Sequence, residues 1–236
     1  MRDTLESRGD SLFPTSRRQL LAWLASSGVV LGAAPLTAFA AREEDPALPS
    51  SVVPALFGGR ETAVGDPCVY LPKSSVLDRA FADGPYLAQA AASSAQAKWQ
   101  MLLADLSMRS PELRIGAVDC FINSFAWIDD DRLYRRADYW ATPSEFLANE
   151  GGDCEDFAIA KYVGLAQLGF SEDRLRIALV YDGRRNLQHA LTVVYWNGDA
   201  IVLDSLALDP LSHTKITRYR PICSFNRRQF WVHRPA

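Results

Sequence analysis

The sequence predicts an α+β domain in which a run of helices is followed by an antiparallel sheet. Three observations support this prediction. Apolar residues recur at helical spacing between residues 86 and 168, strand-like runs occupy residues 176 to 204, and the pair Asn197-Gly198 separates the last two of these runs. Because Asn-Gly is a strong signal for a two-residue β-hairpin, we expect the strands beside it to be antiparallel.

The composition fits one globular catalytic domain. The chain has 236 residues, of which 48% are hydrophobic and 22% are charged, which is enough for one well-filled core. Its formal net charge is −3. Proteins that bind nucleic acid need a basic patch or stripe, and the sequence has none, so nucleic acid is not an expected partner.

The first 40 residues are predicted to be a cleaved export signal. A polar stretch ends in Ser16-Arg17-Arg18-Gln19-Leu20, an apolar run follows, and Ala38-Phe39-Ala40 has the small-x-small pattern of a cleavage site. The two arginines resemble a twin-arginine signal. A permanent membrane anchor is the alternative, but the cleavage pattern and the glycines within the run disfavour it. We therefore expect a periplasmic protein that is soluble after cleavage.

Residues 41–65 are predicted to form an extended lead-in to the domain. This segment contains three prolines and the pair Gly58-Gly59, which indicate loosely packed chain. The domain itself is therefore expected over residues 66–236. Its first core helices are predicted over residues 86–108 and from Pro111 to Phe125, where large apolar side chains recur at helical spacing.

Two further helices are predicted on either side of the Gly151-Gly152 pair. Thr142-Pro143-Ser144-Glu145 has the spacing of a capping box with proline at the first helical position, which predicts a helix over residues 143–148. The next helix is predicted from Cys154 to Leu168, with a glycine directly after it. Cys154 would then begin a helix, where free backbone N–H groups and the helix dipole favour a thiolate over a thiol.

The strands predicted after these helices span residues 176–181, 189–196 and 200–204. If Asn197 and Gly198 form the hairpin turn, Asp204 faces Leu191 on the neighbouring strand. His189 lies two residues from Leu191 and on the same face, so His189 and Asp204 form a diagonal cross-strand pair within side-chain reach. A shift of one residue in the pairing would send the two side chains to opposite faces.

Cys154, His189 and Asp204 together predict a catalytic triad. Each residue alone has an ordinary structural explanation, as a packed thiol, a core histidine and a turn-forming aspartate. Their combination matches a nucleophile, a general base and a group that orients the base. We therefore expect acyl-transfer chemistry at Cys154, with its own backbone N–H as a candidate oxyanion donor.

The remaining cysteines give no sign of a zinc site. Cys68, Cys120 and Cys223 lie far apart and far from Cys154, without the close Cys and His spacings that zinc sites use. A disulfide among the three remains open for a periplasmic protein. Free thiols are favoured, because a protein that folds before twin-arginine export forms its core under reducing conditions.

Three acidic residues surround the predicted nucleophile and suggest a cation. Asp153, Glu155 and Asp156 lie beside Cys154, and their charges would raise the pKa of the thiol unless a positive charge neutralised them. Helix capping and the helix dipole explain one or two of these acids. Calcium accepts irregular sites of carboxylate oxygens, so the three residues are the predicted calcium ligands.

Several motifs resemble the bacterial transglutaminase-like cysteine proteinases of the LapG type. The resemblance implies a core like those of papain and transglutaminase, with the nucleophile on a helix packed against an antiparallel sheet that bears His189 and Asp204. Where the family usually has Leu-Asp-Asn, this chain has serine at position 205. The motifs are Asp138–Pro143, Glu145–Leu147, Gly151–Lys161, Gln188–Ala190 and Leu203–Asp204, within a region from about Asp119 to Trp231.

The same resemblance implies a periplasmic, calcium-dependent endopeptidase. Its substrate would be the N-terminal region of a large, repeat-rich surface adhesin, whose cleavage releases cells from a biofilm. An inner-membrane cyclic-diguanylate receptor would sequester the protease. Two alternatives stay open on the residues alone, namely a protein-crosslinking transglutaminase, in which a lysine amine replaces water, and a non-catalytic transglutaminase-like binding module.

Overall fold

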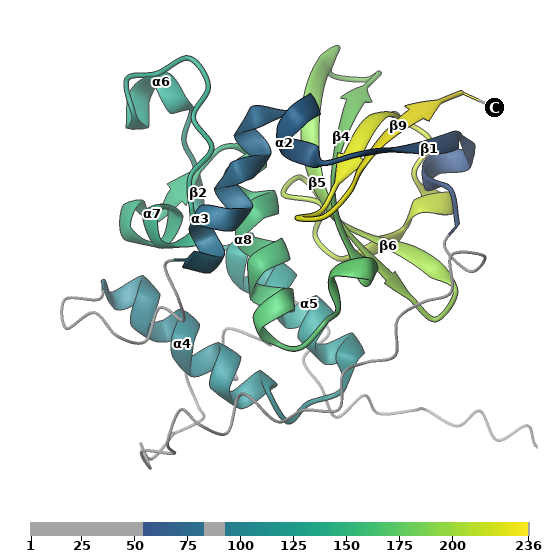
Figure 1. Ribbon diagram of the computed structural model, residues 1–236. Coiled ribbons are helices and arrows are strands. Elements are labelled where there is room, and N and C mark those ends of the chain that lie inside the picture. The colour runs from purple at the N-terminus through teal and green to yellow at the C-terminus, as the bar shows by residue number, and fades with distance from the viewer. Residues whose placement is uncertain (1–53, 83–92, 236) are drawn as a thin grey trace, which may run out of the picture. The chain divides into compact units, whose positions relative to one another are not determined.

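The fold is built on a seven-stranded sheet with helices packed along one face (Figure 1). His189 lies in one of its strands, and Asp204 directly follows another. The computed structural model describes residues 54–82 and 93–235. The predicted export signal and the first half of the predicted lead-in lie outside these ranges. Among the residues that are described, no helix has both the length and the apolar character needed to cross a membrane.

The helices and strands that the sequence predicts occur in the predicted order, and the structure adds β1 before them and β7, β8 and β9 after them. The α-helices are α2 (Pro67–Tyr70), α3 (Val76–Ala82), α4 (Ser94–Leu106), α5 (Pro111–Ile122), α6 (Asp130–Leu133), α7 (Pro143–Asn149) and α8 (Cys154–Gln167), and the 3-10 helices are η3 (Leu56–Gly58), η4 (Pro72–Ser75), η5 (Glu172–Arg174) and η6 (His213–Lys215). The strands are β1 (Arg60–Gly65), β2 (Ala126–Trp127), β3 (Gly151–Gly152), β4 (Leu175–Asp182), β5 (Leu187–Trp196), β6 (Asp199–Leu203), β7 (Leu211–Ser212), β8 (Tyr219–Phe225) and β9 (Phe230–Arg234). The fold class is α+β, as predicted.

Capping side chains determine where the helices around the candidate site begin. Thr142 and Glu145 form the predicted capping box at the start of α7. Asp153 and Asp156 form a second capping box at the start of α8. Gly169 follows α8 with a φ of 91°, the left-handed conformation that glycine allows after a helix. Both helices therefore lie where the sequence places them.

The domain begins earlier than predicted. Leu56 is fully buried, and residues 60–65 form β1, which pairs with β9 at the edge of the sheet. The predicted boundary at residue 66 is therefore wrong. The prolines and glycines of this segment indicate loops, but they do not reveal a strand whose partner lies at the other end of the chain. The predicted helix over residues 86–108 is described from Ser94 and ends at Leu106.

The pairing of β5 with β6 follows the predicted register. All strands of the sheet are antiparallel, in the order β1-β9-β8-β4-β5-β6-β7. Trp196 faces Asp199, and the turn residues Asn197 and Gly198 have φ values of 51° and 77°, as a type I′ turn requires. Asp204, the first residue after β6, is thereby placed beside β5.

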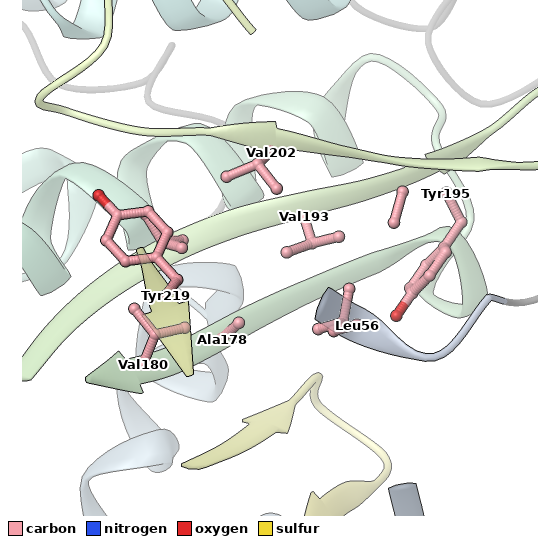
Figure 2. Packing of buried hydrophobic residues seen from close by; sticks show 9 residues of the cluster. Leu56, Ala178, Val180, Val193, Tyr195, Val202 and Tyr219 are labelled. Carbon is pink, nitrogen blue, oxygen red and sulfur yellow. The ribbon is translucent and has the colours of Figure 1, made fainter. Parts of the chain in front are cut away.

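Both faces of the central strands are buried. On one face, the hydroxyl of Thr192 in β5 donates to the backbone carbonyl of Ala158 in α8 at 2.7 Å. Helix α8 also contacts α3, α5 and α7, which fixes the direction of the helix that begins with Cys154. On the opposite face, Leu56 packs against a cluster of sheet residues (Figure 2), namely Ala178, Val180, Leu191, Val193, Tyr195, Ala200, Val202 and Tyr219.

Candidate active site

Cys154 is the first residue of α8 and follows a tight passage of the chain. After α7, Glu150 adopts a left-handed conformation with a φ of 53°. Gly151 and Gly152 then form β3, which pairs in parallel with β2. A Cβ atom at Gly152 would overlap the side chain of Asp156, so the position beside the helix start requires glycine.

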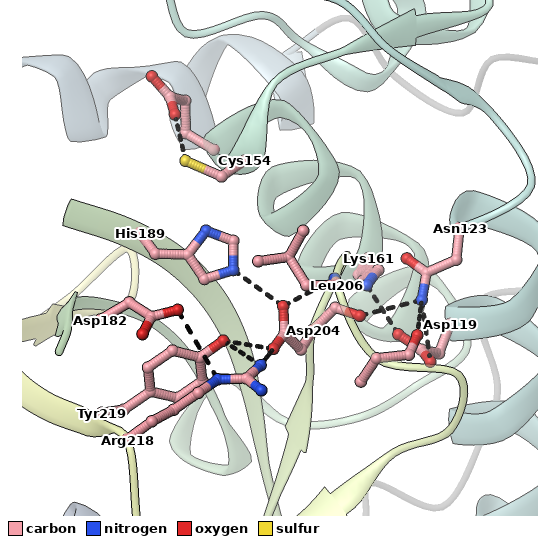
Figure 3. A network of polar contacts seen from close by, with 12 residues as sticks. Asp119, Asn123, Cys154, Lys161, Asp182, His189, Asp204, Leu206, Arg218 and Tyr219 are labelled. Atoms are coloured by element: carbon pink, nitrogen blue, oxygen red, sulfur yellow. Dashed lines mark hydrogen bonds and ion pairs between the residues drawn. The ribbon is translucent and has the colours of Figure 1, made fainter. Parts of the chain in front are cut away.

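His189 and Asp204 are in contact, as the hairpin register predicts. His189 Nε2 lies 2.8 Å from Asp204 Oδ1, and each residue is 2% exposed. Because an ionised carboxylate has no proton to donate, Nε2 carries the hydrogen and Nδ1 is the basic nitrogen. Within the described part of the chain, Nδ1 has no hydrogen-bond partner. Figure 3 shows the His189 ring between Cys154 and Asp204.

Asp204 is held by donors on both carboxylate oxygens. The backbone N–H of Leu206 donates to Oδ1 at 2.9 Å, and the Tyr219 hydroxyl and Arg218 Nη2 donate to Oδ2 at 2.6 and 2.9 Å. Burial opposes ionisation, but the hydrogen bonds from His189, Tyr219 and the Leu206 N–H outweigh it and lower the pKa of Asp204 to about 2. Asp204 is therefore a carboxylate at physiological pH.

The Cys154 thiol lies in a different electrostatic environment. It donates to Glu155 Oε2, with a sulfur–oxygen distance of 3.0 Å. The backbone N–H of Ala190, the residue after His189, also hydrogen-bonds the sulfur and favours the thiolate. Burial, followed by the charge of Glu155, nevertheless raises the pKa of Cys154 well above its ordinary value. The helix start alone therefore does not produce the thiolate expected from the sequence.

Acidic residues from two segments meet beside Cys154. Oxygen atoms of Asp130, Asp153 and Asp156 lie within 4.8 Å of one another, and so do oxygen atoms of Asp130, Asp138 and Glu155. The sequence predicted the three acids next to Cys154 but missed Asp130 and Asp138, which come from the segment around α6. The only local signal for Asp130 is its position within a run of three aspartates.

Two oxygen atoms in this acidic cluster have no hydrogen-bond partner in the described structure. They are Asp130 Oδ1 and Asp153 Oδ1, both buried. Burial raises the pKa of Asp156 to about 8, and burial together with Glu155 raises the pKa of Asp153. Buried carboxylates without partners are costly, and a hard cation with oxygen ligands would satisfy them. The donor set therefore fits such a cation.

A comparison with known families decides the identity of the domain. The family model of the bacterial transglutaminase-like cysteine proteinases, BTLCP, matches residues 94–233, which is more than half of the chain. The chain belongs to this family. It is therefore a cysteine protease, and its fold is the helix-and-antiparallel-sheet fold of this family.

The proteinase is also similar to solved structures of LapG from Legionella pneumophila. The sequences are 28% identical, the TM-score is 0.56, and the match covers 68% of this chain and 87% of that chain. The calcium-bound form of LapG gives the same values, and for the EGTA-treated form the match covers 84% of that chain. A comparison with curated proteins gives no match.

Asp156 differs from the other acids of the proteinase's acidic cluster. Its Oδ1 accepts the backbone N–H of Ala141 at 2.7 Å, and its Oδ2 accepts the backbone N–H of Asp153 at 3.4 Å. Both oxygens thus serve the start of α8 and the preceding loop. Of the three predicted calcium ligands, Asp156 has the most evident structural role.

The four cysteines of the proteinase all lie in the described part of the chain, and none of them is in a disulfide. Cys68, Cys120 and Cys154 are partly exposed, and Cys223 is buried. The structure thus contains none of the disulfides that the sequence left open, and free thiols are the favoured state.

Proposed function

We propose that this cysteine protease is a calcium-dependent endopeptidase that acts through Cys154, His189 and Asp204. One observation carries the proposal. The imidazole of His189 donates from Nε2 to an ionised aspartate, while its basic Nδ1 is free and faces the side of the nucleophile helix. This is the arrangement of a general base held in one tautomer by a third group.

The proposed reaction is transfer of a peptide acyl group to water. His189 Nδ1 takes the proton of the Cys154 thiol, and the sulfur attacks the scissile carbonyl carbon to form a tetrahedral intermediate. The intermediate collapses to a thioester, and the departing amine takes the proton from His189. Water, deprotonated by His189, then cleaves the thioester and restores the thiol. Asp204 stabilises the imidazolium in both halves of the reaction.

The thiol must leave Glu155 before this chemistry begins. Rotation about the Cα–Cβ bond of Cys154 is sufficient to move the sulfur away from Glu155 Oε2. At the start of α8, the backbone N–H of Cys154 is a suitable donor for the oxyanion that forms on the substrate.

Calcium is the proposed resident cation of the acidic cluster. Asp130, Asp138, Asp153 and Glu155 would hold it, and Asp156 would support the loop on which Asp153 lies. Bound calcium supplies positive charge that offsets the carboxylates beside the thiol. The unpartnered oxygens of Asp130 and Asp153 support this assignment, and so does the existence of calcium-bound LapG.

The proposed substrate is the N-terminal region of a large, repeat-rich surface adhesin, and its cleavage would release cells from a biofilm. We place the reaction in the periplasm, after removal of residues 1–40. The partner that restrains the protease would be an inner-membrane cyclic-diguanylate receptor. These assignments rest on the likeness to the LapG-type proteinases and on the signal-like Arg17-Arg18 and Ala38–Ala40 motifs.

A cleavage assay tests the proposal. Residues 41–236 are incubated with an N-terminal fragment of a large adhesin encoded in the same genome, with calcium or with EGTA, and the products are separated by mass. We expect two shorter fragments with calcium, and an intact substrate with EGTA or with Cys154→Ala. Products heavier than the substrate would instead indicate crosslinking, and cleavage by Cys154→Ala would refute the assigned nucleophile.

A further inference from the structure

We infer that Asn123, at the end of α5, positions the carboxylate of Asp204 for catalysis by holding the turn that follows β6. The inference rests on the catalytic role proposed for Asp204 above. Asn123 touches neither the candidate nucleophile nor the base, so it is a positioning residue.

The contacts of the Asn123 amide are all with hydrogen-bond acceptors. Its Nδ2 lies 3.0 Å from the backbone oxygen of Asp204, 3.4 Å from that of Ala207, and 3.3 Å from Asp119 Oδ2. With three acceptor oxygens around it, the amide must present its NH2 group to them. One side chain from the helical part of the fold thus holds both ends of the turn from Asp204 to Ala207.

The turn has its own internal bonds, but these do not attach it to the rest of the molecule. The Ala207 N–H donates to the Asp204 carbonyl at 3.2 Å, and the Leu206 N–H donates to the Asp204 carboxylate. The hydroxyl of Ser205 gives the turn no further anchor, since this buried oxygen has no hydrogen-bond partner among the described residues. Asn123 therefore provides the link between this turn and α5 (Figure 3).

A buried ion pair supports Asn123 from behind. Asp119 Oδ1 lies 2.7 Å from Lys161 Nζ, and both side chains are 1% exposed. Lys161 belongs to α8, two turns after Cys154, and Asp119 belongs to α5. The helix that begins with the nucleophile is thereby connected to the turn that contains Asp204, through one charge pair and one amide.

This network of hydrogen bonds and an ion pair is not needed merely to fill the core. Apolar residues of similar volume often stabilise a core as well as a buried ion pair does, and sometimes better. Here the carboxylate of Asp119 is used a second time, as an acceptor for the Asn123 amide. Because Asn123 then donates to the Asp204 carbonyl, the network fixes the place of Asp204 relative to α8. Small displacements of catalytic groups have large effects on rate.

The test compares Asn123→Ala in two backgrounds, with calcium present and the cleavage assay as readout. In the native background we expect kcat to fall on the order of tenfold to hundredfold, with KM changed by less than about twofold. In the Asp204→Ala background the same substitution should cause no further loss, because its effect acts through that carboxylate. The proton resonance of His189 Nε2–H, identified by its absence in Asp204→Ala, should shift or broaden in Asn123→Ala.

Two further variants separate positioning from general stability. Asn226→Ala removes a more deeply buried amide, which donates to the carbonyl of Glu172 at 2.9 Å. It should lower the melting temperature without changing kcat or the His189 resonance. Asn123→Ser keeps a shorter donor and should give an intermediate kcat, which preserves the test if Asn123→Ala does not fold.

The inference is overturned if folded Asn123→Ala keeps kcat within about twofold of the native value, which is below the cost of a displaced catalytic group. If Asn123→Ala does not fold, the same limit applies to Asn123→Ser. It is also overturned if Asn123→Ala costs as much in the Asp204→Ala background as in the native one. Failure of the proposed function looks different, because Cys154→Ala would then still cleave the substrate, whatever the behaviour of the Asn123 variants.

Discussion

The two halves of the candidate site differ in how completely their polar groups are satisfied. In the half formed by the sheet, both oxygens of Asp204 accept hydrogen bonds, and these lower its pKa to about 2. In the half formed around α8, buried oxygens of Asp130 and Asp153 have no partner in the described structure, and the pKa of Cys154 is raised. The proposed base is therefore held in position by its partners, whereas the thiol of the proposed nucleophile lies in surroundings that oppose its ionisation.

In the half formed by the sheet, the polypeptide itself supplies the partners of the buried polar groups. In the half formed around α8, a bound ligand would have to supply them. Hydrogen-bond donors at the start of β8 and in the turn after β6 hold Asp204, and Asp204 in turn accepts the hydrogen bond of His189, so no further component is needed to orient the imidazole. The acidic cluster needs positive charge, and no lysine or arginine is paired with Asp153 or Glu155 among the described residues. In the proposed mechanism, the folded chain therefore holds its base in place, and its nucleophile depends on a bound cation.

The largest loss of activity is expected when a member of the proposed triad is removed. Cys154→Ala, His189→Ala and Asp204→Ala should each lower kcat by at least about 10³-fold, and double variants should lose little more, because the three residues act as a unit. Cleavage kinetics of each purified variant measure the loss, and circular dichroism confirms the fold. Normal cleavage by folded Cys154→Ala would contradict the assignment.

Removal of calcium by a chelator should affect only the half of the site that is formed around α8. EGTA is expected to abolish cleavage and lower the melting temperature, and excess calcium should restore both, because a ligand bound only by the folded state stabilises that state. Calorimetric titration of the EGTA-treated, dialysed protein measures the binding directly. If millimolar calcium gives no heat and no shift in melting temperature, the cation has no place in the mechanism.

The two halves should also respond to pH with opposite signs. Asp156 has a pKa raised to about 8, so the chelated folded protein binds more protons than the unfolded chain, and its stability should fall as pH rises from about 4 to 8. Asp204 has a lowered pKa, so its contribution is present above about pH 4 and is lost as pH falls toward 2. Thermal melts across pH, with EGTA and with calcium, measure both slopes. Calcium should flatten the first slope only, and an unchanged slope would argue against binding at this cluster.

The smallest effects are expected from substitutions of single proposed calcium ligands, which test how much each acid contributes to the cation site. Asp130→Asn should weaken calcium binding by about tenfold or more, because Asp130 is 3% exposed and contributes an oxygen without a partner. Asp138→Asn should cost only a few-fold, because its side chain is 55% exposed and already pairs with Lys73. Calorimetry ranks the two variants. The reverse order would show that Asp138 lies closer to the cation.

Sequence reasoning succeeded where local rules determine geometry. The Asn197-Gly198 turn fixes the register of the β5–β6 hairpin, and that register brings His189 to Asp204. The capping box at Thr142 likewise fixed the start of α7. In each case the deciding residues lie within a few positions of one another, so a short stretch of sequence carries the information. The catalytic roles of the triad stay predictions.

The missed residues come from segments that only tertiary structure brings together. Arg218 and Tyr219 reach Asp204 from β8 and the residue before it, Asp130 reaches Asp153 from the start of α6, and Asn123 reaches Asp204 from the end of α5. None of these segments has a local sequence pattern that identifies the residue it contacts. The strands β1, β8 and β9 were missed as well, because their polar and apolar residues alternate too weakly to identify them.

The pairing of β1 with β9 has a consequence for how the protein is made. Arg60 and Arg234 are neighbours in the sheet although they lie near opposite ends of the described chain. During synthesis β1 leaves the ribosome long before β9, so this edge of the sheet closes only after β9 has been made. Contacts between such distant segments also slow folding. Any export machinery that accepts only folded protein would therefore act after β9 has paired with β1.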